Sequence, residues 1–131
     1  MTDDPRAGVL PFNAEAAPPV GTLERRVLDA LWRDRRPHTA RDVLEALREG
    51  GDPVPAYTTV ATVLGHLFDK GLLTRELTGR VWSYEAALTG CQFSAAHMVR
   101  SLAETNDRER CLTRFVGMLD DADRELLRSL L

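Results

Sequence analysis

The sequence has few of the features that mark secreted, membrane-bound or disulfide-stabilised proteins. Its 131 residues contain two cysteines, Cys91 and Cys111, which form no CxxC pair and exclude a disulfide framework and a zinc ribbon. No stretch approaches the roughly 18 consecutive apolar residues that a membrane-spanning helix needs. The acidic start, MTDDPRAGVL, lacks the charged-then-apolar layout of a signal peptide. These absences predict a reduced, cytoplasmic protein without membrane insertion.

Motifs of enzymes and of cofactor sites are missing as well. The four serines stand in no GxSxG elbow, and the three histidines stand in no HExxH motif or Cys/His ligand spacing. The sequence also has no glycine-rich phosphate loop. We therefore expect a binding protein without catalytic residues, cofactor or metal, rather than an enzyme.

Lysine is almost absent, and charges of both signs are spread evenly. Sixteen of the 17 basic residues are arginine, a bias typical of genome-wide codon usage. The net charge is −3, and residues 21–86 contain ten basic and ten acidic side chains. No segment is a basic arm of the kind that coats nucleic acid non-specifically. A sequence-specific reader is compatible with this balance, because it depends on the charge of its contact face.

The chain divides into a tail and a helical body. Residues 1–20 contain four prolines and no helical or strand period, which predicts a disordered N-terminal tail. Thr22 can cap a first helix, whose apolar stripe ends before Pro37. Thr39 and Asp42 form a capping-box start for a second helix, which ends at Gly50-Gly51.

A third helix is predicted from Tyr57 to Lys70, with Gly71 as its stop. Its apolar face holds Val60, Val63, Leu64 and Leu67, and the opposite side holds Thr58, Thr62, Gly65 and Asp69. Two strand-like runs follow, Leu73–Leu77 and Val81–Glu85, around the turn signal Thr78-Gly79-Arg80. Three helices and a hairpin in this order predict that residues 21–86 form a winged helix-turn-helix domain.

Residues 87–131 carry the apolar pattern of three further short helices. So short a segment cannot bury this much apolar surface alone, and a second copy related by two-fold symmetry is the simplest cover. The fold class is therefore mainly α, with a small β-hairpin wing and a C-terminal helical dimerisation region. The expected dimerisation residues are Phe93, Val99, Leu102, Leu112, Phe115, Val116, Leu119, Leu126, Leu127 and Leu130.

The third helix is the candidate for reading DNA. A helix in the major groove presents its N-terminal residues to the base edges. Threonine hydroxyls can bond bases or phosphates, and threonine methyls can meet the thymine methyl group. The helix start at Thr39 offers backbone N–H groups to a phosphate. The candidate DNA-binding residues are Thr39, Tyr57, Thr58, Thr59, Thr62, His66, Lys70, Arg75 and Arg80.

The residues leave several alternatives open. Tyr57 can contact DNA or pack inward as an N-terminal staple. Gly65 permits close approach either of DNA or of a neighbouring helix. Trp82 and Tyr84 are expected to cover the underside of the wing rather than stack on bases. The alternative function is a winged-helix module for protein–protein interaction without DNA binding.

Several runs of residues together resemble a known family. They are Leu28-Asp29-Ala30-Leu31-Trp32, Thr39 to Val43, Tyr57 to Leu64, Lys70 to Leu73, Gly79-Arg80 and Tyr84. The set is similar to the penicillinase-repressor family of winged-helix regulators, the BlaI/MecI type, from about Gly21 to the C-terminus.

The resemblance implies a homodimeric bacterial repressor that binds double-stranded DNA at a palindromic operator. It places Thr58, Thr59 and Thr62 in the recognition helix and Arg75, Gly79 and Arg80 in the wing. In characterised members, which regulate antibiotic resistance, a membrane-bound sensor protease cuts the repressor in its dimerisation helices when a β-lactam is detected. The matching bond here is Arg114–Phe115.

This sequence departs from the family pattern at three positions. His66 stands where some members have arginine, Ala86 stands where the wing ends in proline, and Arg114 stands where the cleaved bond has asparagine. A copper-responsive branch of the family has clustered C-terminal cysteines, and Cys91 and Cys111 do not form such a cluster.

Overall fold

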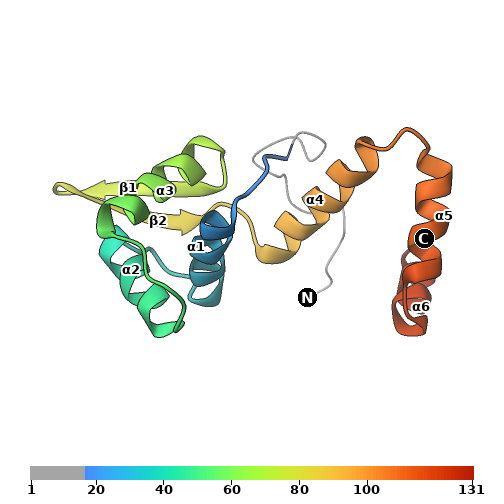
Figure 1. Cartoon of the computed structure of the whole chain (residues 1–131), viewed down its shortest axis with the longest axis horizontal. Coiled ribbons are helices and arrows are strands. Elements are labelled where there is room, and N and C mark those ends of the chain that lie inside the picture. Colours follow the sequence, from blue (N-terminus) through green and yellow to red (C-terminus); the bar gives the residue numbers. More distant parts are fainter. Residues whose placement is uncertain (1–16) are drawn as a thin grey trace.

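The computed structural model describes residues 17–131, which form six helices and one hairpin in the predicted order (Figure 1). The winged helix-turn-helix fold class is thereby confirmed. The elements are α1 (Thr22–Arg33), α2 (Ala40–Glu49), α3 (Tyr57–Asp69), β1 (Leu73–Thr78), β2 (Val81–Ala86), α4 (Gly90–Ala103), α5 (Arg108–Met118) and α6 (Asp121–Leu130). None of the helices within residues 17–131 is long and apolar enough to cross a membrane.

The described residues begin at Ala17, four residues before the predicted boundary of the winged domain. Residues 1–16 of the expected tail lie outside the described residues, but Ala17 is buried. The Arg100 guanidinium donates a hydrogen bond to the Ala17 carbonyl at 2.6 Å. Residues 17–20 are therefore packed against the body, and the prediction of disorder up to residue 20 is wrong for this short stretch.

Local capping explains where the first two helices begin. The N-cap of α1 is Gly21 rather than Thr22, because the Glu24 carboxylate reaches back and accepts from the Gly21 N–H at 3.0 Å. The capping box of α2 is confirmed: Thr39 Oγ1 accepts from the Asp42 N–H at 3.1 Å, and the Asp42 carboxylate accepts from the Thr39 N–H at 3.0 Å.

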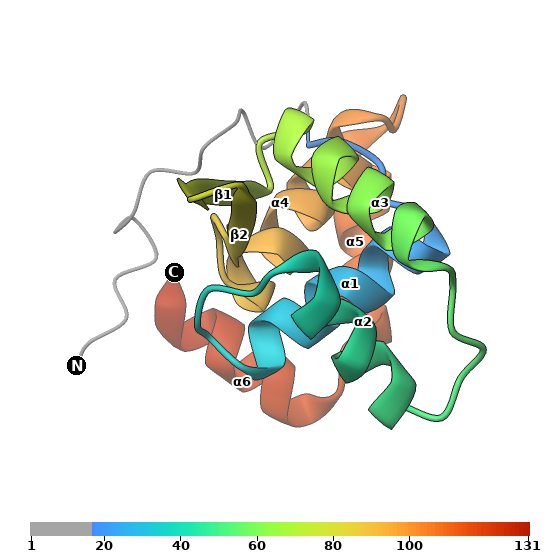
Figure 2. The ribbon, with the colours of Figure 1, turned by 90° about the vertical axis from the view of Figure 1, so that its left-hand side faces the viewer.

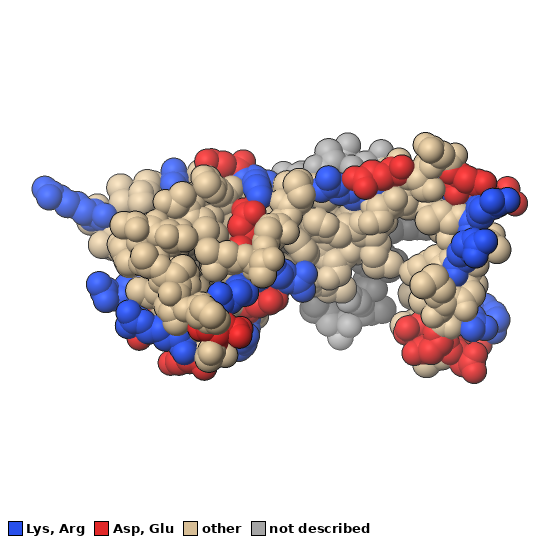
Figure 3. Space-filling model, viewed as in Figure 1, with Lys and Arg blue, Asp and Glu red and all other residues tan. Residues whose placement is uncertain are grey.

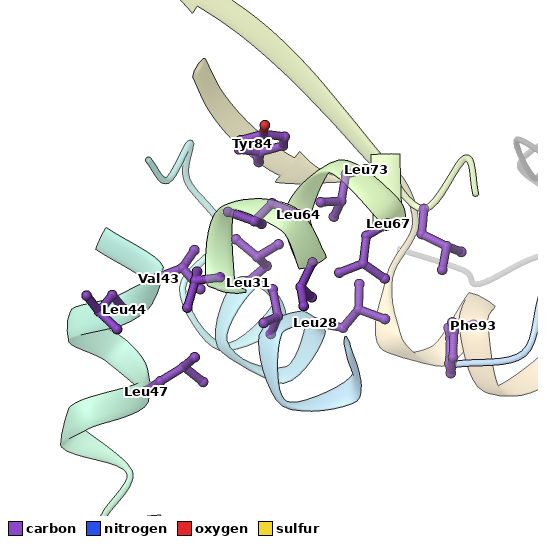
Figure 4. Packing of buried hydrophobic residues seen from close by; sticks show 14 of the residues in the cluster. Leu28, Leu31, Val43, Leu44, Leu47, Leu64, Leu67, Leu73, Tyr84 and Phe93 are labelled. Atoms are coloured by element: carbon purple, nitrogen blue, oxygen red, sulfur yellow. The ribbon is translucent and has the colours of Figure 1, made fainter. Parts of the chain in front are cut away.

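The core lies between α1, α2 and α3, and it is closed by the base of the wing (Figure 4). Each helix contributes a stripe of buried aliphatic residues at the predicted spacing. Gly71 follows α3 with a φ of 80°, a left-handed conformation that lets the chain turn directly into β1. The core residues are Val27, Leu28, Leu31, Val43, Leu44, Leu47, Val60, Val63, Leu64, Leu67, Leu72, Leu73, Tyr84, Leu88 and Phe93.

The wing is an antiparallel hairpin of β1 and β2. Thr78 pairs with Val81, so the loop has two residues, Gly79 and Arg80, one fewer than the turn signal predicted. Gly79 has a φ of 65°, which suits a tight hairpin turn. Tyr84 is buried and exchanges two backbone hydrogen bonds with His38, of 2.9 and 2.7 Å, which tie the wing to the entrance of α2.

The C-terminal helices are joined to the winged domain mainly through Trp32. Its indole N–H donates to the Leu88 carbonyl at 3.0 Å, and its ring lies 5.2 Å from that of Phe93. Phe93 is only 4% exposed and belongs to the core of its own chain. This burial favours a core role for Phe93 over the predicted place on the dimerisation surface. The α5 and α6 helices lie at the opposite end of the molecule from the wing (Figure 1).

Candidate nucleic-acid interface

The α3 helix lies at the same end of the molecule as the wing (Figure 2). Because Val60, Leu64 and Leu67 are buried against α1 and α2, the opposite side of the helix must face solvent. The three threonines Thr58, Thr59 and Thr62 are all exposed. The structure therefore presents the residues predicted to read bases on one accessible surface.

The threonine side chains differ in their hydrogen-bonding capacity. The Thr62 hydroxyl donates to the Thr58 carbonyl at 2.9 Å within the helix. Its oxygen can still accept a hydrogen bond, and its methyl group can make apolar contacts. This bond fixes the orientation of the Thr62 hydroxyl, so its oxygen is available to accept a hydrogen bond from a ligand.

Tyr57 does not pack inward as a staple. Its side chain is 48% exposed at the first position of α3, and the Arg41 guanidinium lies 5.8 Å from the centre of its ring. Arg41 of α2 was not among the predicted site residues, although its place two residues after the Thr39 cap put it on an exposed first turn. The pair adds one aromatic ring and one positive charge to the threonine surface.

Lys70 is engaged within the chain. Its ammonium group lies 2.7 Å from both carboxylate oxygens of Glu24 and 3.0 Å from the Pro19 carbonyl. Three partners match its three N–H donors, so no donor is left for a phosphate. This geometry favours a structural role for Lys70 over the predicted DNA contact. His66, one turn earlier, is exposed.

The electrostatics of Glu24 agree with this role for Lys70. Desolvation raises the pKa of the Glu24 carboxyl, but the Lys70 hydrogen bond and charge and the Gly21 N–H together bring it below its usual value. The carboxylate is therefore held in its charged form at the start of α1.

The start of α2 is already occupied by a carboxylate. The hydrogen bond from the Thr39 N–H is the largest influence on the Asp42 pKa and holds it below its usual value. Thr39 Oγ1 accepts from the Asp42 N–H at 3.1 Å. A phosphate at this helix start would meet the Asp42 charge, so the structure favours a capping role for Thr39 over the predicted phosphate contact.

The wing supplies two arginines that differ in setting. Arg80 stands at the exposed hairpin tip, where Figure 3 shows a basic side chain reaching outward. Arg75 lies on the strand, and its guanidinium contacts the rings of Phe68 and Trp82. Tyr84 covers the underside of the wing as expected, and Trp82, on the same face of the hairpin, is 38% exposed and packs on Arg75.

A second surface lies on the C-terminal helices. An open, mainly apolar groove of about 690 Å³ lies between α4 and α5, and the predicted dimerisation residues Val99, Leu102, Leu112 and Phe115 line it. No residue of α5 or α6 is buried. Val116, Leu126 and Leu130 are exposed, whereas Leu119 and Leu127 are partly covered.

The same groove contains His97, whose Nε2 is buried and has no hydrogen-bond partner among residues 17–131. Desolvation lowers the pKa of His97, and the charges of Arg100 and Arg25 lower it further. The neutral imidazole is therefore favoured, which keeps this groove apolar.

Comparison with known proteins identifies the family. The penicillinase repressor family model matches residues 20–131. The chain belongs to the penicillinase repressor family. The transcriptional regulator BlaI of Mycobacterium tuberculosis (strain H37Rv) is 38% identical over 109 residues, which cover 79% of this chain and 78% of BlaI. The BlaI sequence of strain CDC 1551 / Oshkosh matches equally well.

Solved structures that are similar to this chain are more distant in sequence. MepR, a transcription regulator of the Staphylococcus aureus multidrug efflux pump MepA, is 17% identical, with a TM-score of 0.45 over 84% of this chain and 73% of MepR. The YusO protein of Bacillus subtilis is 15% identical, with a TM-score of 0.45 over 84% of this chain and 69% of YusO.

Family membership establishes the general role of the chain. As a penicillinase repressor family protein with a winged helix-turn-helix, it is a DNA-binding transcriptional regulator and not an enzyme.

Proposed function

We propose that this protein is a homodimeric repressor that binds an inverted-repeat operator. The observation that carries the proposal is the separation of two surfaces at opposite ends of the chain (Figures 1 and 2). One end exposes the threonines of α3 beside the wing arginines, and the other end exposes the apolar faces of α4 to α6.

In this proposal α3 enters the major groove with its N-terminal turn first. Thr58, Thr59 and Thr62 meet base edges and thymine methyl groups, and Tyr57 stands at the groove edge. Arg75 and Arg80 contact the adjacent backbone. One basic side chain reaches outward at the wing tip, whereas acidic side chains gather where α6 begins (Figure 3). This distribution favours approach of DNA to the α3 end, despite the net charge of −3.

The dimer follows from the lack of a core beneath α5 and α6. Isolated helices of about ten residues are unstable in water unless an apolar face is packed. Phe115, Val116 and Leu126 are each at least 38% exposed in the single chain. A second copy can cover these faces, and two-fold symmetry then places two α3 helices on half-sites about one helical turn apart, or a multiple of that.

Dimer formation also offers a point of control. Two half-sites bound together give much tighter binding than one, so anything that weakens the dimer releases the operator. The Arg114–Phe115 bond lies inside α5, which is exposed and contains no buried residue. Local opening of α5 makes this bond accessible to a protease, and a membrane-bound sensor protease is the class that we propose for this step.

The proposal is tested by fluorescence anisotropy on a duplex from upstream of the protein's own gene. A scrambled duplex is measured beside it, each at two salt concentrations. We expect the native duplex to bind at least about 10³-fold more tightly. Weak and equal binding to both duplexes contradicts this choice of operator. Selection of bound genomic fragments then separates an operator elsewhere from the alternative, a protein–protein interaction module.

The dimer surface is tested with Phe115→Glu and a matched control, Thr113→Glu. Both changes place a carboxylate on α5, but residues 113 and 115 lie on opposite sides of the helix. We expect Phe115→Glu to give a monomer by sedimentation velocity and to lose operator binding, while the winged domain stays folded by circular dichroism. Thr113→Glu should remain dimeric. A Phe115→Glu protein that stays dimeric and binds normally refutes this assignment of the dimer surface.

A further inference from the structure

Two aromatic rings contact the guanidinium of Arg75. Its central carbon lies 3.9 Å from the centre of the Phe68 ring and 4.1 Å from the centre of the Trp82 ring. At these distances the guanidinium is in van der Waals contact with both rings at once. We call this arrangement of Phe68, Trp82 and Arg75 the arginine slot.

The slot arises from the junction of α3 with the wing. Gly71 turns the chain from α3 into β1, which brings the wing against the end of α3, where Phe68 is located. In the hairpin Arg75 pairs with Tyr84, and Leu77 pairs with Trp82. Paired and alternate residues share one face of a hairpin, so Trp82 is a diagonal neighbour of Arg75 on the face that carries Phe68.

The edges of the Arg75 guanidinium are left unused. Other arginines of the chain pair with carboxylates, such as Arg25 with Asp29 and Arg48 with Glu45. Within residues 17–131, no carboxylate or carbonyl accepts a hydrogen bond from Arg75. With two rings in contact with the guanidinium, the groups left for a ligand are the N–H bonds in its plane. Such a planar fork matches two oxygens of one phosphate.

We propose that Phe68 and Trp82 are positioning residues that hold Arg75 for a bidentate contact with a DNA phosphate. This inference rests on the proposed function and specifies the backbone contact made where α3 meets the wing. A flexible arginine loses rotamer freedom when it binds, and this loss of entropy weakens binding. The two rings already restrict the Arg75 side chain in the free protein, so less entropy is lost on binding. The rings therefore raise affinity through Arg75 without touching DNA themselves.

The test is a double-mutant cycle with Arg75→Gln, Trp82→Leu and the double variant, measured by anisotropy on the native and the scrambled duplex at several salt concentrations. Arg75→Gln should weaken both duplexes about tenfold or more, since a charge-assisted hydrogen bond is lost. The slope of log K against log salt should become shallower by about 0.9 for each subunit. A phosphate contact affects both duplexes equally, whereas a base contact affects only the native one.

Trp82→Leu should weaken binding several-fold while the salt slope stays at the wild-type value, because the Arg75 charge is retained. In the Arg75→Gln background it should have no further effect, since Trp82 acts only through Arg75. Trp82→Phe, which keeps a ring over the guanidinium, should restore most of the affinity. Trp82 is 38% exposed and outside the core, so the variants are expected to fold, and thermal unfolding checks this.

Each other outcome overturns a defined part of the inference. An unchanged salt slope in Arg75→Gln shows that Arg75 only joins the wing to α3. Equal losses from Trp82→Leu in the wild-type and Arg75→Gln backgrounds show that Trp82 contacts DNA directly. Upfield ring-current shifts of the Arg75 side-chain protons, lost in Trp82→Leu, test the slot in the free protein. If the wild type binds no DNA while these shifts are present, the proposed function fails although the slot exists.

Discussion

Gly65 offers a sharp test of how closely α3 approaches DNA. A glycine inside a helix is less favourable than alanine by about 1 kcal/mol. Gly65 lies in the middle of α3, and a Cβ built there meets no heavy atom within 4 Å. Of the two explanations left open by the sequence, close approach of a neighbouring helix therefore finds no support within the described chain. Close approach of DNA remains, and Gly65 lies on the same side of α3 as Thr58 and Thr62.

Gly65→Ala should consequently move stability and affinity in opposite directions. We expect the free energy of unfolding to rise by about 0.5–1 kcal/mol and Tm to rise by about 2–8 °C in calorimetry. Operator affinity should fall at least about tenfold, equivalent to about 1.4 kcal/mol, because the added methyl group prevents the closest contact.

The control for Gly65→Ala is Thr113→Ala. This change also replaces an exposed helical residue by alanine, but in α5, far from α3. It should raise stability by about 0.5 kcal/mol and leave operator affinity unchanged. If Gly65→Ala is more stable and binds the operator as tightly as the wild type, the reasoning about close approach is refuted. If it is less stable, the reading of Gly65 as an unstrained helical position is wrong.

Three further outcomes follow from the contacts within the winged domain. Lys70→Met leaves the Glu24 carboxylate without its charged partner, so the free energy of unfolding in urea should fall by about 1–3 kcal/mol. The slope of log K for DNA binding against log salt should stay unchanged. A shallower slope would show that Lys70 contacts DNA after all. The pKa values of Glu24 and Asp42 are lowered on folding, so their contribution to stability is complete above pH 4.5, the ordinary pKa of glutamate, and is lost as the pH falls through the folded values. Asp42→Asn should therefore flatten the acid limb of a stability-against-pH curve, and an unchanged limb would contradict the assigned role of this carboxylate. Leu64→Ala opens a cavity at a fully buried position and should lower the free energy of unfolding in urea by about 2–5 kcal/mol. A loss below about 1 kcal/mol would show that the core collapses around this position.

The elements of this fold could be predicted because their signals are local. The apolar period of α3, the capping box at Thr39 and the stop at Gly71 each depend on residues a few positions apart. The exposure of Thr58 and Thr62 then follows from the burial of the opposite face of the helix. The predicted reading surface is thus largely a consequence of helical periodicity.

The partnerships of individual side chains could not be predicted in the same way. Lys70 and Glu24 are 46 residues apart, and nothing near Lys70 in the sequence distinguishes an ion pair from a DNA contact. Phe93 has the spacing of a dimerisation residue, but the ring of Trp32, far away in the chain, covers it. Side chains of these types have several suitable partners, and only the tertiary fold decides among them.

Trp32 contacts the start of the C-terminal region, and DNA binding by the proposed dimer depends on this contact being rigid. The winged domain has its own core, whereas α5 and α6 have none, so operator binding must depend on how α4 connects the two parts. That connection includes Trp32, which is bonded to the Leu88 carbonyl and packed on Phe93, and the Arg100 bond to Ala17. In the proposed dimer, rigid contacts between α4 and the winged domain fix the distance between the two α3 helices. A small rotation of α4 relative to the winged domain would shift the two α3 helices by a larger distance. In the proposed dimer, the contacts that hold α4 against the winged domain therefore set the spacing of the half-sites, and the exposed face of α3 recognises each half-site.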